Sequence, residues 1–286
     1  MRHLIAATLN IWNKSGPWIE RLALIRRDIE TIGPEILGLQ EVLRVVPSNA
    51  PAPPLSAETD QATEIAQGFG YHVAYAIASD YPNGLKFGNA LLSRYPILEE
   101  RTFRLPDGGS GEGRSLLYAL VESPLGRLPV FVTHLNWKFH EGNVRLQQVA
   151  YIAERISALA PEGAGLLPPV LMGDFNAEPE ADEIRYLRGL HTHQGKSVFF
   201  ADAWLYGGDG SPGYTFARDN DYAAPHREYS RRIDYIFVRG PDAELRGEPV
   251  NARLAFDVPE LGHSGRVWPS DHYGLVTEIV LEPTNR

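Results

Sequence analysis

The sequence predicts an α+β protein in which two mostly antiparallel β-sheets pack face to face, with helices on their outer sides. Strand-like runs of apolar and β-branched residues recur along the whole chain and outnumber the helical segments. The helical segments fall between groups of strands. These strands are too many for one small sheet. Helices between the strand groups are typical of a fold in which helices cover the outer faces of two packed sheets.

The elements are expected in the following order. Strands are predicted at Leu4–Leu9, Ile36–Leu39, His72–Ile77, Asn89–Leu92, Ser115–Val121, Leu128–Leu135, Val170–Asp174, Ile233–Val238, Val250–Phe256 and Tyr273–Leu281. Helical spacing of apolar residues predicts helices around Leu22–Ile32, behind Ser15-Gly16-Pro17, and around Leu146–Ile156, opening near Asn143. A shorter helix is expected at Ala181–Leu190.

No linker divides the chain, so one domain over residues 1–286 is expected. The Pro- and Ala-rich segment Pro47–Ser56, the Gly-rich segment Pro106–Gly113 and the polar segment Tyr206–Arg231 each interrupt this domain. Long loops inside a compact fold are often binding loops.

The composition is that of an ordinary globular protein, because 43% hydrophobic residues in 286 can form a sizeable core. The net charge of −9, from 27 basic and 36 acidic residues, argues against sequence-independent binding to long nucleic acid. The absence of cysteine excludes disulfides and thiol nucleophiles. Because no secretory or membrane-spanning stretch is found, we expect a cytoplasmic protein without stable membrane association or an obligate protein partner.

The most informative segment is the apolar run before Gly173-Asp174-Phe175-Asn176. It predicts a strand buried on both faces, with Asp174 and Asn176 at the sheet edge. Two interpretations are open: an Asx turn in which Gly173 has a positive φ, or a pair of side chains that serve one phosphate or metal. The second is favoured by polar residues at other strand ends: Thr8-Leu9-Asn10, Leu39-Gln40-Glu41, Val132-Thr133-His134-Leu135, Arg232-Ile233-Asp234-Tyr235 and Pro269-Ser270-Asp271-His272-Tyr273.

This ordered series resembles the endonuclease/exonuclease/phosphatase superfamily, and Gly88-Asn89-Ala90-Leu91-Leu92-Ser93-Arg94-Tyr95-Pro96-Ile97 also matches a segment common there. The superfamily includes deoxyribonuclease I, abasic-site endonucleases, neutral sphingomyelinases, inositol polyphosphate 5-phosphatases and 5′-tyrosyl-DNA phosphodiesterases. The resemblance spans Asn10 to His272. It implies a four-layered αββα sandwich with the site at one end of the sheets, and hydrolysis of phosphate esters that depends on Mg²⁺ or Mn²⁺.

The resemblance also implies a metal site. Glu41 is the best candidate for the direct ligand, because Mg²⁺ usually takes one or two carboxylates and keeps several waters. Asn10 is expected to orient Glu41 or to hold a metal-bound water, and Asp271 to complete the surroundings of the metal.

The remaining family positions are expected to carry the acid–base chemistry. His272 is predicted to be the general base or a cation that orients the phosphate, held by Asp234. The alternative, in which Asp174 activates the water, stays open. Asn176 is expected to donate to the scissile phosphate, and His134 to donate to another phosphoryl oxygen or to protonate the leaving group.

Other candidates for substrate contact rest on weaker signals. Arg114 begins a strand after a Gly-rich loop, and Trp137 and Trp268 flank His134 and Asp271 as a possible aromatic wall. Arg145 and Gln148, on the helix after His134, are expected to support loops.

The substrate stays open among three interpretations. The acidic balance and Thr-His-Leu favour a phosphodiesterase or phosphatase for a small or lipid-linked ester. A nuclease or DNA-end-processing enzyme is favoured by three segments: Asp202-Ala203-Trp204, Tyr214-Thr215-Phe216 and the closing Ser-Asp-His. In that case the basic cluster of Arg227, Arg231 and Arg232 would contact the phosphate backbone of a nucleic-acid strand. A non-catalytic binding module would lack one of Glu41, Asp174, Asp234 or His272, and all four are present.

Overall fold

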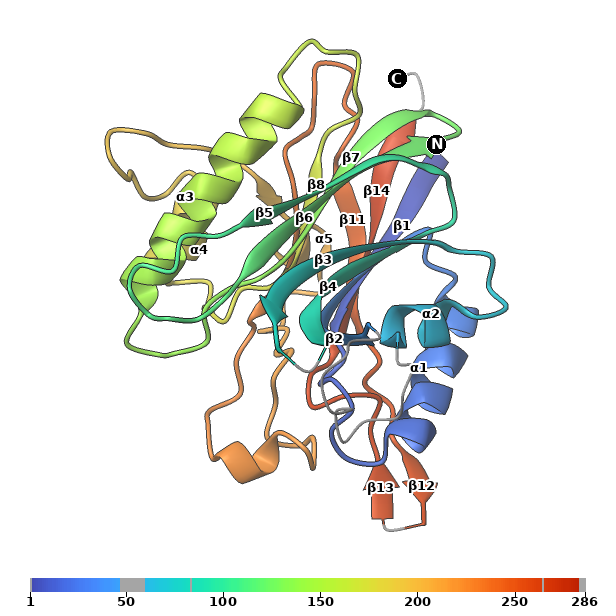
Figure 1. Ribbon diagram of the computed structural model, residues 1–286. Helices are drawn as coiled ribbons and strands as arrows, with labels where there is room; N and C mark the ends of the chain where they lie inside the picture. Colours follow the sequence, from blue (N-terminus) through green and yellow to red (C-terminus); the bar gives the residue numbers. More distant parts are fainter. Residues whose placement is uncertain (1, 47–59, 83, 264, 283–286) are drawn as a thin grey trace.

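Two six-stranded sheets pack face to face in the computed structural model, with α1 and α2 on one outer side and α3 and α4 on the other (Figure 1). The structure describes residues 2–46, 60–82, 84–263 and 265–282, so the predicted loop Pro47–Ser56 lies outside the described residues. The predicted α+β class and its αββα layers are confirmed.

The first sheet has the strand order β11-β14-β1-β2-β4-β3. Its strands are β1 (Arg2–Asn10), β2 (Ile36–Val45), β3 (His72–Asp80), β4 (Leu85–Ser93), β11 (Pro249–Ala255) and β14 (Gly274–Glu282). The second sheet has the order β5-β6-β7-β8-β10-β9. Its strands are β5 (Ile97–Arg104), β6 (Ser115–Ser123), β7 (Gly126–His134), β8 (Val170–Asp174), β9 (Ala201–Asp202) and β10 (Asp234–Val238).

The helices connect or flank these strands. They are α1 (Trp18–Ile32), α2 (Gln61–Ala66), α3 (Gly142–Leu159), α4 (Asp182–Leu187), α5 (Ala203–Gly207) and the 3₁₀ helix η1 (Ala224–His226). A small hairpin of β12 (Glu260–Gly262) and β13 (Gly265–Val267) projects beyond the sheets (Figure 1). No helix of the described residues is long and apolar enough to cross a membrane.

Each sheet contains one parallel pair, and the other strand pairs are antiparallel. In the first sheet β1 runs parallel to β2, with α1 between them in the chain. In the second sheet β7 runs parallel to β8, with α3 between them. Each helix packs on the outer face of its sheet, as a crossover between parallel strands requires.

Alternation of side chains along the strands explains the layers. In β1, Leu4 and Ala6 enter the core between the sheets, whereas Ala7 and Leu9 face α1. In β8, Met172 enters the inter-sheet core and its neighbour Leu171 faces α3. β8 is therefore buried on both faces, as its continuous apolar run predicts.

The short strands β9, β12 and β13 were not predicted, and two longer strands, β2 and β5, differ from the prediction for a local reason. β2 does not end at Leu39, because its pairing with β4 resumes at Val42 after a register shift. β5 was not predicted, because it is an edge strand whose charged side chains hide the alternation typical of a half-buried strand.

Candidate active site

The candidate site lies at the carboxyl ends of β1 and β8, which are inner strands of the two sheets. This end of the paired sheets is opposite the two chain termini (Figure 1). Asn10 ends β1 in the first sheet and Asp174 ends β8 in the second. The Asn10 Nδ2 atom donates to Asp174 Oδ2 at 3.0 Å, and both side chains are buried. The two sheets therefore share one hydrogen bond at the centre of the site.

Gly173 turns the chain at the end of β8. Its φ is 145°, and a Cβ at this position would lie 1.9 Å from the Thr133 carbonyl oxygen, so only glycine fits. Asp174 Oδ1 then accepts a hydrogen bond from the Asn176 backbone N–H at 2.8 Å, which closes an Asx turn. The turn is therefore confirmed and is compatible with the second interpretation, because it uses one oxygen of Asp174 and leaves the other facing the site.

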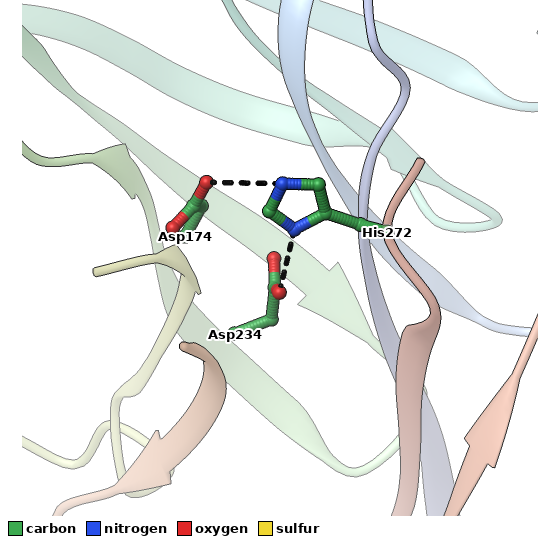
Figure 2. Close-up of side chains that lie close together, drawn as sticks. All are labelled: Asp174, Asp234 and His272. Carbon is green, nitrogen blue, oxygen red and sulfur yellow. Dashed lines mark hydrogen bonds and ion pairs between the residues drawn. The ribbon is translucent and has the colours of Figure 1, made fainter. Parts of the chain in front are cut away.

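His272 lies between two carboxylates (Figure 2). Its Nδ1 is 2.9 Å from Asp234 Oδ2, and its Nε2 is 3.9 Å from Asp174 Oδ2. Burial alone would lower the pKa of His272, but Asp234, followed by Asp271 and Asp174, outweighs burial and raises this pKa to about 10. The ring is therefore an imidazolium at neutral pH, with its Nε2–H turned toward Asp174.

His134 has the opposite protonation state. Burial, helped by the positive charges of Arg114 and His272, lowers the pKa of His134 well below its ordinary value. Its Nε2 lies 3.4 Å from Asp174 Oδ2. The neutral ring can donate a hydrogen bond but is a poor source of a proton, which argues against leaving-group protonation by His134.

Asp174 has a higher pKa than Asp271, the other carboxylate of the site whose pKa is raised. Burial, and then the nearby Asp234 carboxylate, raise the pKa of Asp174 to about 7, although His272 and hydrogen bonds from Asn10 and Asn176 oppose the rise. A carboxylate with such a pKa can accept a proton near neutral pH.

Glu41 lies within β2 and not at its end, which corrects the prediction. Gln40 and Glu41 together oppose Asn89 of β4, so they form a β-bulge, and Glu41 has a φ of 59°. The bulge turns the Glu41 side chain to the site, where it accepts hydrogen bonds from Asn13 Nδ2 at 3.0 Å and Asn10 Nδ2 at 3.4 Å.

Glu41 and Asp271 form the acidic side of the site. Asp271 is buried and receives a hydrogen bond from Ser270 Oγ at 3.2 Å. Burial raises the pKa of Asp271 to about 6, and the negative charge of Glu41 adds to the rise while His272 opposes it. The two carboxylates supply oxygen ligands of the type that Mg²⁺ and Mn²⁺ prefer.

A second group also has the composition of a metal site. Ligand atoms of Asp174, Asp234 and His272 lie within 4.8 Å of one another. Here, however, the positive imidazolium already occupies the space between the carboxylates, and a protonated histidine nitrogen cannot bind a metal. Glu41 and Asp271 are the better candidates for a cation, with Asn10 as the residue that orients Glu41.

Arg21 of α1 ties together the loops behind this acidic side. It is fully buried and donates to the carbonyl oxygens of Ile11, Ser15 (2.6 Å), Asn13 (3.3 Å) and Pro269 (3.2 Å). These carbonyls belong to the loop after β1 and to the segment before Asp271. One guanidinium therefore fixes two segments that carry site residues.

The site opens into a cleft of about 460 Å³ that includes most of the predicted residues. Arg114 and Trp137 line it, and Trp137 is 58% exposed. Trp268 does not line it, which corrects that prediction. Its ring is buried against Tyr273, and its Nε1 donates to Asp221 at 3.0 Å.

The predicted basic cluster is divided in the structure. Arg232 is buried and forms two hydrogen bonds with Asp202, at 3.0 and 2.9 Å, so it is unavailable to a strand backbone. Arg227 is exposed after η1, and only Arg231 of the three lines the cleft. The sequence shows three arginines within six positions, but it does not show that Asp202, thirty positions before Arg232, is the partner of Arg232.

The loop after His134 has the support that was predicted. Gln148 accepts from the Asn136 N–H at 3.1 Å, and Arg145 donates to the Asn136 and Lys138 carbonyl oxygens and to Glu183. Phe139 and Glu112 also line the cleft, although no sequence signal had singled them out.

Comparison with known proteins agrees with this architecture. Residues 7–272 match the endonuclease/exonuclease/phosphatase family. No curated protein matches the chain. An endonuclease/exonuclease/phosphatase from Beutenbergia cavernae has 24% identity and a TM-score of 0.71, over 99% of this chain and 72% of that one.

Two further solved structures show the same fold. The endonuclease/exonuclease/phosphatase from Bacteroides vulgatus has 21% identity and a TM-score of 0.72, over 99% of this chain and 100% of that one. Truncated TDP2 from Caenorhabditis elegans has 17% identity and a TM-score of 0.68, over 97% and 98% of the two chains. The family match covers nearly the whole chain, including every strand end that forms the site, and the chain belongs to the endonuclease/exonuclease/phosphatase family.

Proposed function

We propose that this protein hydrolyses phosphate esters with a divalent cation, as a phosphodiesterase or phosphatase in which water attacks the phosphoryl group. The observation that carries the proposal is the environment of Asp174 Oδ2. This oxygen accepts from Asn10 at 3.0 Å and lies 3.4 Å from His134 and 3.9 Å from His272. A potential base is thus surrounded by donors that suit a phosphoryl group, in a chain of a hydrolytic family.

Glu41 and Asp271 would hold the cation, with Asn10 and Asn13 orienting Glu41. The donor set fits Mg²⁺ or Mn²⁺, because both ligands are carboxylates and, in the protein alone, the charge of Glu41 contributes to the raised pKa of Asp271. When bound, such a cation neutralises charge on the phosphoryl oxygens.

Asp174 would accept a proton from the attacking water. Its pKa of about 7 suits this role, whereas His272, with a pKa of about 10, holds its proton too tightly to act as the base at neutral pH. This difference favours Asp174 between the two candidates.

His272 and Asn176 would bind the phosphoryl oxygens. The distance of 3.9 Å between His272 Nε2 and Asp174 is too long for a hydrogen bond, so the Nε2–H is free for an oxyanion. Asn176 Nδ2 uses one hydrogen for the Leu135 carbonyl at 3.2 Å and has a second for the substrate. Donors fixed before the reaction stabilise the transition state most effectively.

A second candidate function is nuclease or DNA-end-processing activity. Trp137 and Phe139 favour it, because they line the cleft and are 58% and 60% exposed, so a base can stack on them. Five acidic residues line the same cleft and disfavour the binding of a long nucleic acid, which is a polyanion: Glu41, Glu112, Asp174, Glu228 and Asp271.

A hydrolysis panel with Mg²⁺ or Mn²⁺ tests the proposal and separates the alternatives. Its substrates are a generic aryl phosphodiester, an oligonucleotide, a 5′-tyrosyl oligonucleotide, sphingomyelin and phosphoinositides. We expect chelation to abolish activity, and Asp174→Ala and His272→Ala each to lower kcat by about 10²–10⁴-fold. Activity that persists in chelator, or at the wild-type rate in both variants, would overturn the mechanism, and no activity on any substrate would favour the binding module.

A further inference from the structure

The buried arginines of the described residues fall into two groups. They are Arg21, Arg114, Arg145, Arg231 and Arg232. Three of them, Arg21, Arg145 and Arg232, leave no buried nitrogen without a partner. The other two line the cleft, and each has a buried nitrogen that no described residue accepts from: Nε and Nη1 of Arg114, and Nε of Arg231. Because an unpaired buried donor is costly, a donor of this kind on a residue that lines the cleft suits a water or a ligand oxygen as its acceptor.

Arg114 belongs to the part of the cleft that the proposed reaction already uses. Its positive charge acts directly on His134, whose Nε2 faces Asp174. Glu112 pairs with Nη2 of the guanidinium, whereas Nε and Nη1 have no partner among the described residues. The acceptor expected at Arg114 is therefore an oxygen of the scissile phosphoryl group.

Arg231 belongs to a different part of the cleft, on the segment that leads into β10. Its guanidinium carbon lies 4.5 Å from the Phe139 ring centroid and 5.8 Å from the Phe216 centroid. Phe216 in turn lies 5.1 Å from the His272 ring. Phe216 therefore contacts both Arg231 and His272, and Arg231 itself has no described hydrogen bond or ion pair with the residues around Asp174.

The two rings also restrict how Arg231 can bind a ligand. They lie against the planar guanidinium, so its remaining hydrogen-bonding edge is the part left for a partner. Glu228 pairs with Nη2 but is partly exposed, with 24% of its side chain accessible. Its Nε–H has no described acceptor, and a guanidinium with a permanent charge suits an oxyanion.

We propose that Arg231 forms a second anion subsite, so that the preferred substrate carries an additional phosphate beyond the scissile phosphodiester. This inference rests on the proposed phosphodiesterase function. The additional phosphate can be a terminal phosphate of a small ester or the next phosphodiester of an oligonucleotide, and the two differ in charge and in length. Glu228 competes with the ligand for Arg231 and thereby weakens this subsite.

Three chromogenic probes test the subsite. The first is thymidine 5′-(4-nitrophenyl phosphate), the second is the same ester with a 3′-phosphate, and the third is the same ester extended by one nucleotide at the 3′ position. We expect the wild-type protein to prefer at least one phosphate-bearing probe over the first by about tenfold or more in kcat/KM. Preference for the second probe indicates a small ester, and preference for the third indicates an oligonucleotide.

Substitutions with opposite expected effects identify the residue responsible. Arg231→Met should reduce the preference to near unity, Arg231→Lys should retain part of it, and Glu228→Gln should increase it because the competing carboxylate is gone. The matched control is Arg101→Met, since Arg101 is exposed on β5 and pairs only with Glu99 among its described charged neighbours. If Arg231→Met does not fold, Glu228→Gln still tests the same competition.

The outcomes separate this inference from the function on which it rests. Hydrolysis of all three probes with equal kcat/KM, or a preference that survives Arg231→Met in the folded protein, would overturn the subsite and leave the phosphodiesterase function intact. A decrease of the preference in Glu228→Gln would also overturn it. No hydrolysis of any probe, together with no hydrolysis in the substrate panel above, would overturn the proposed function itself.

Discussion

His272 Nδ1 lies 2.9 Å from Asp234 Oδ2, and the two buried residues come from different sheets. Asp234 begins β10 in the second sheet, and His272 precedes β14 in the first. The pair fixes the ring so that its Nε2–H faces Asp174. A carboxylate in this position orients an imidazole and stabilises its charged form.

Asp234→Asn should therefore lower activity and the pKa of His272 together. Without the carboxylate we expect this pKa to fall from about 10 toward its ordinary value of 6.5, so that activity declines at a lower alkaline pH. At neutral pH, kcat should decrease by about 10²-fold or more. NMR titration of the His272 ring and the pH profile of kcat measure the two effects. Asp209→Asn, at an exposed loop, is the control, and an unchanged pKa would contradict the assignment.

The metal-free protein should lose stability as the pH rises from about 5 to about 9. The folded-state pKa of Asp174 is about 7, above its ordinary value of 3.8, so its contribution is complete below pH 3.8 and is lost as the pH rises to about 7. Asp271 acts in the same direction up to about pH 6. His272 stabilises fully below pH 6.5, and its contribution is lost toward about pH 10.

Thermal unfolding in chelator across this pH range measures the decline in Tm. Asp174→Asn should flatten it between about pH 5 and pH 7, because the group that titrates there has been removed. Mg²⁺ or Mn²⁺ should raise the Tm more at about pH 8 than at about pH 5, where protons compete for the carboxylates. An increase of Tm with pH in chelator would contradict the raised pKa values.

Gly173→Ala should destabilise the protein severely. The added Cβ would lie 1.9 Å from the Thr133 carbonyl oxygen, and the φ of 145° is unfavourable for alanine. Because β7 and β8 must separate locally, we expect a loss of more than about 3 kcal/mol in the free energy of unfolding, measured with urea. Gly163→Ala is the control: its φ is 76° but no atom lies within 4 Å of the added Cβ, so it should cost only about 1 kcal/mol.

Arg114→Met and Arg145→Met should have opposite consequences, although both arginines are buried. Arg145 donates to two carbonyl oxygens and to Glu183, so its loss should lower the free energy of unfolding by about 3–5 kcal/mol. Arg114 keeps two unpaired nitrogens at the cleft, so its loss should leave stability nearly unchanged and reduce kcat/KM by about tenfold or more. Urea unfolding and steady-state kinetics on one aryl phosphodiester compare the pair. If Arg114→Met caused a large loss of stability and Arg145→Met did not, Arg114 would be the structural residue of the pair.

The sequence predicted the layers well, because alternation and continuous apolar runs record which faces of a strand are buried. β8 is the clearest case, since Val170–Asp174 was predicted with its observed bounds. β5 was missed because Glu99, Glu100 and Arg101 interrupt its pattern at an exposed edge. α2 was missed because its segment shows no repeated apolar spacing: Ile65 is the one large apolar residue among its six.

The candidate site was predicted less completely, for reasons of geometry. Residue types and order indicated Asn10, Asp174 and His272, but not that Glu41 turns into the site through a bulge, because a bulge depends on pairing with β4. Trp268 is next to a site segment in the chain but is buried with Asp221 in the fold. Arg231 could not be distinguished from Arg232 without knowing that Asp202 lies beside only one of them.

The hydrogen bond between Asn10 and Asp174 would make the proposed catalysis depend on how the two sheets are aligned. Each sheet supplies half of the reactive groups, and neither half is complete alone. The sheets are in close contact at Gly38, where an added Cβ would lie 2.7 Å from Met172 Sδ. A substitution at this contact would slide one half of the site against the other without touching the substrate. The proposed activity would therefore depend on packing in the hydrophobic interior as well as on the groups at the cleft.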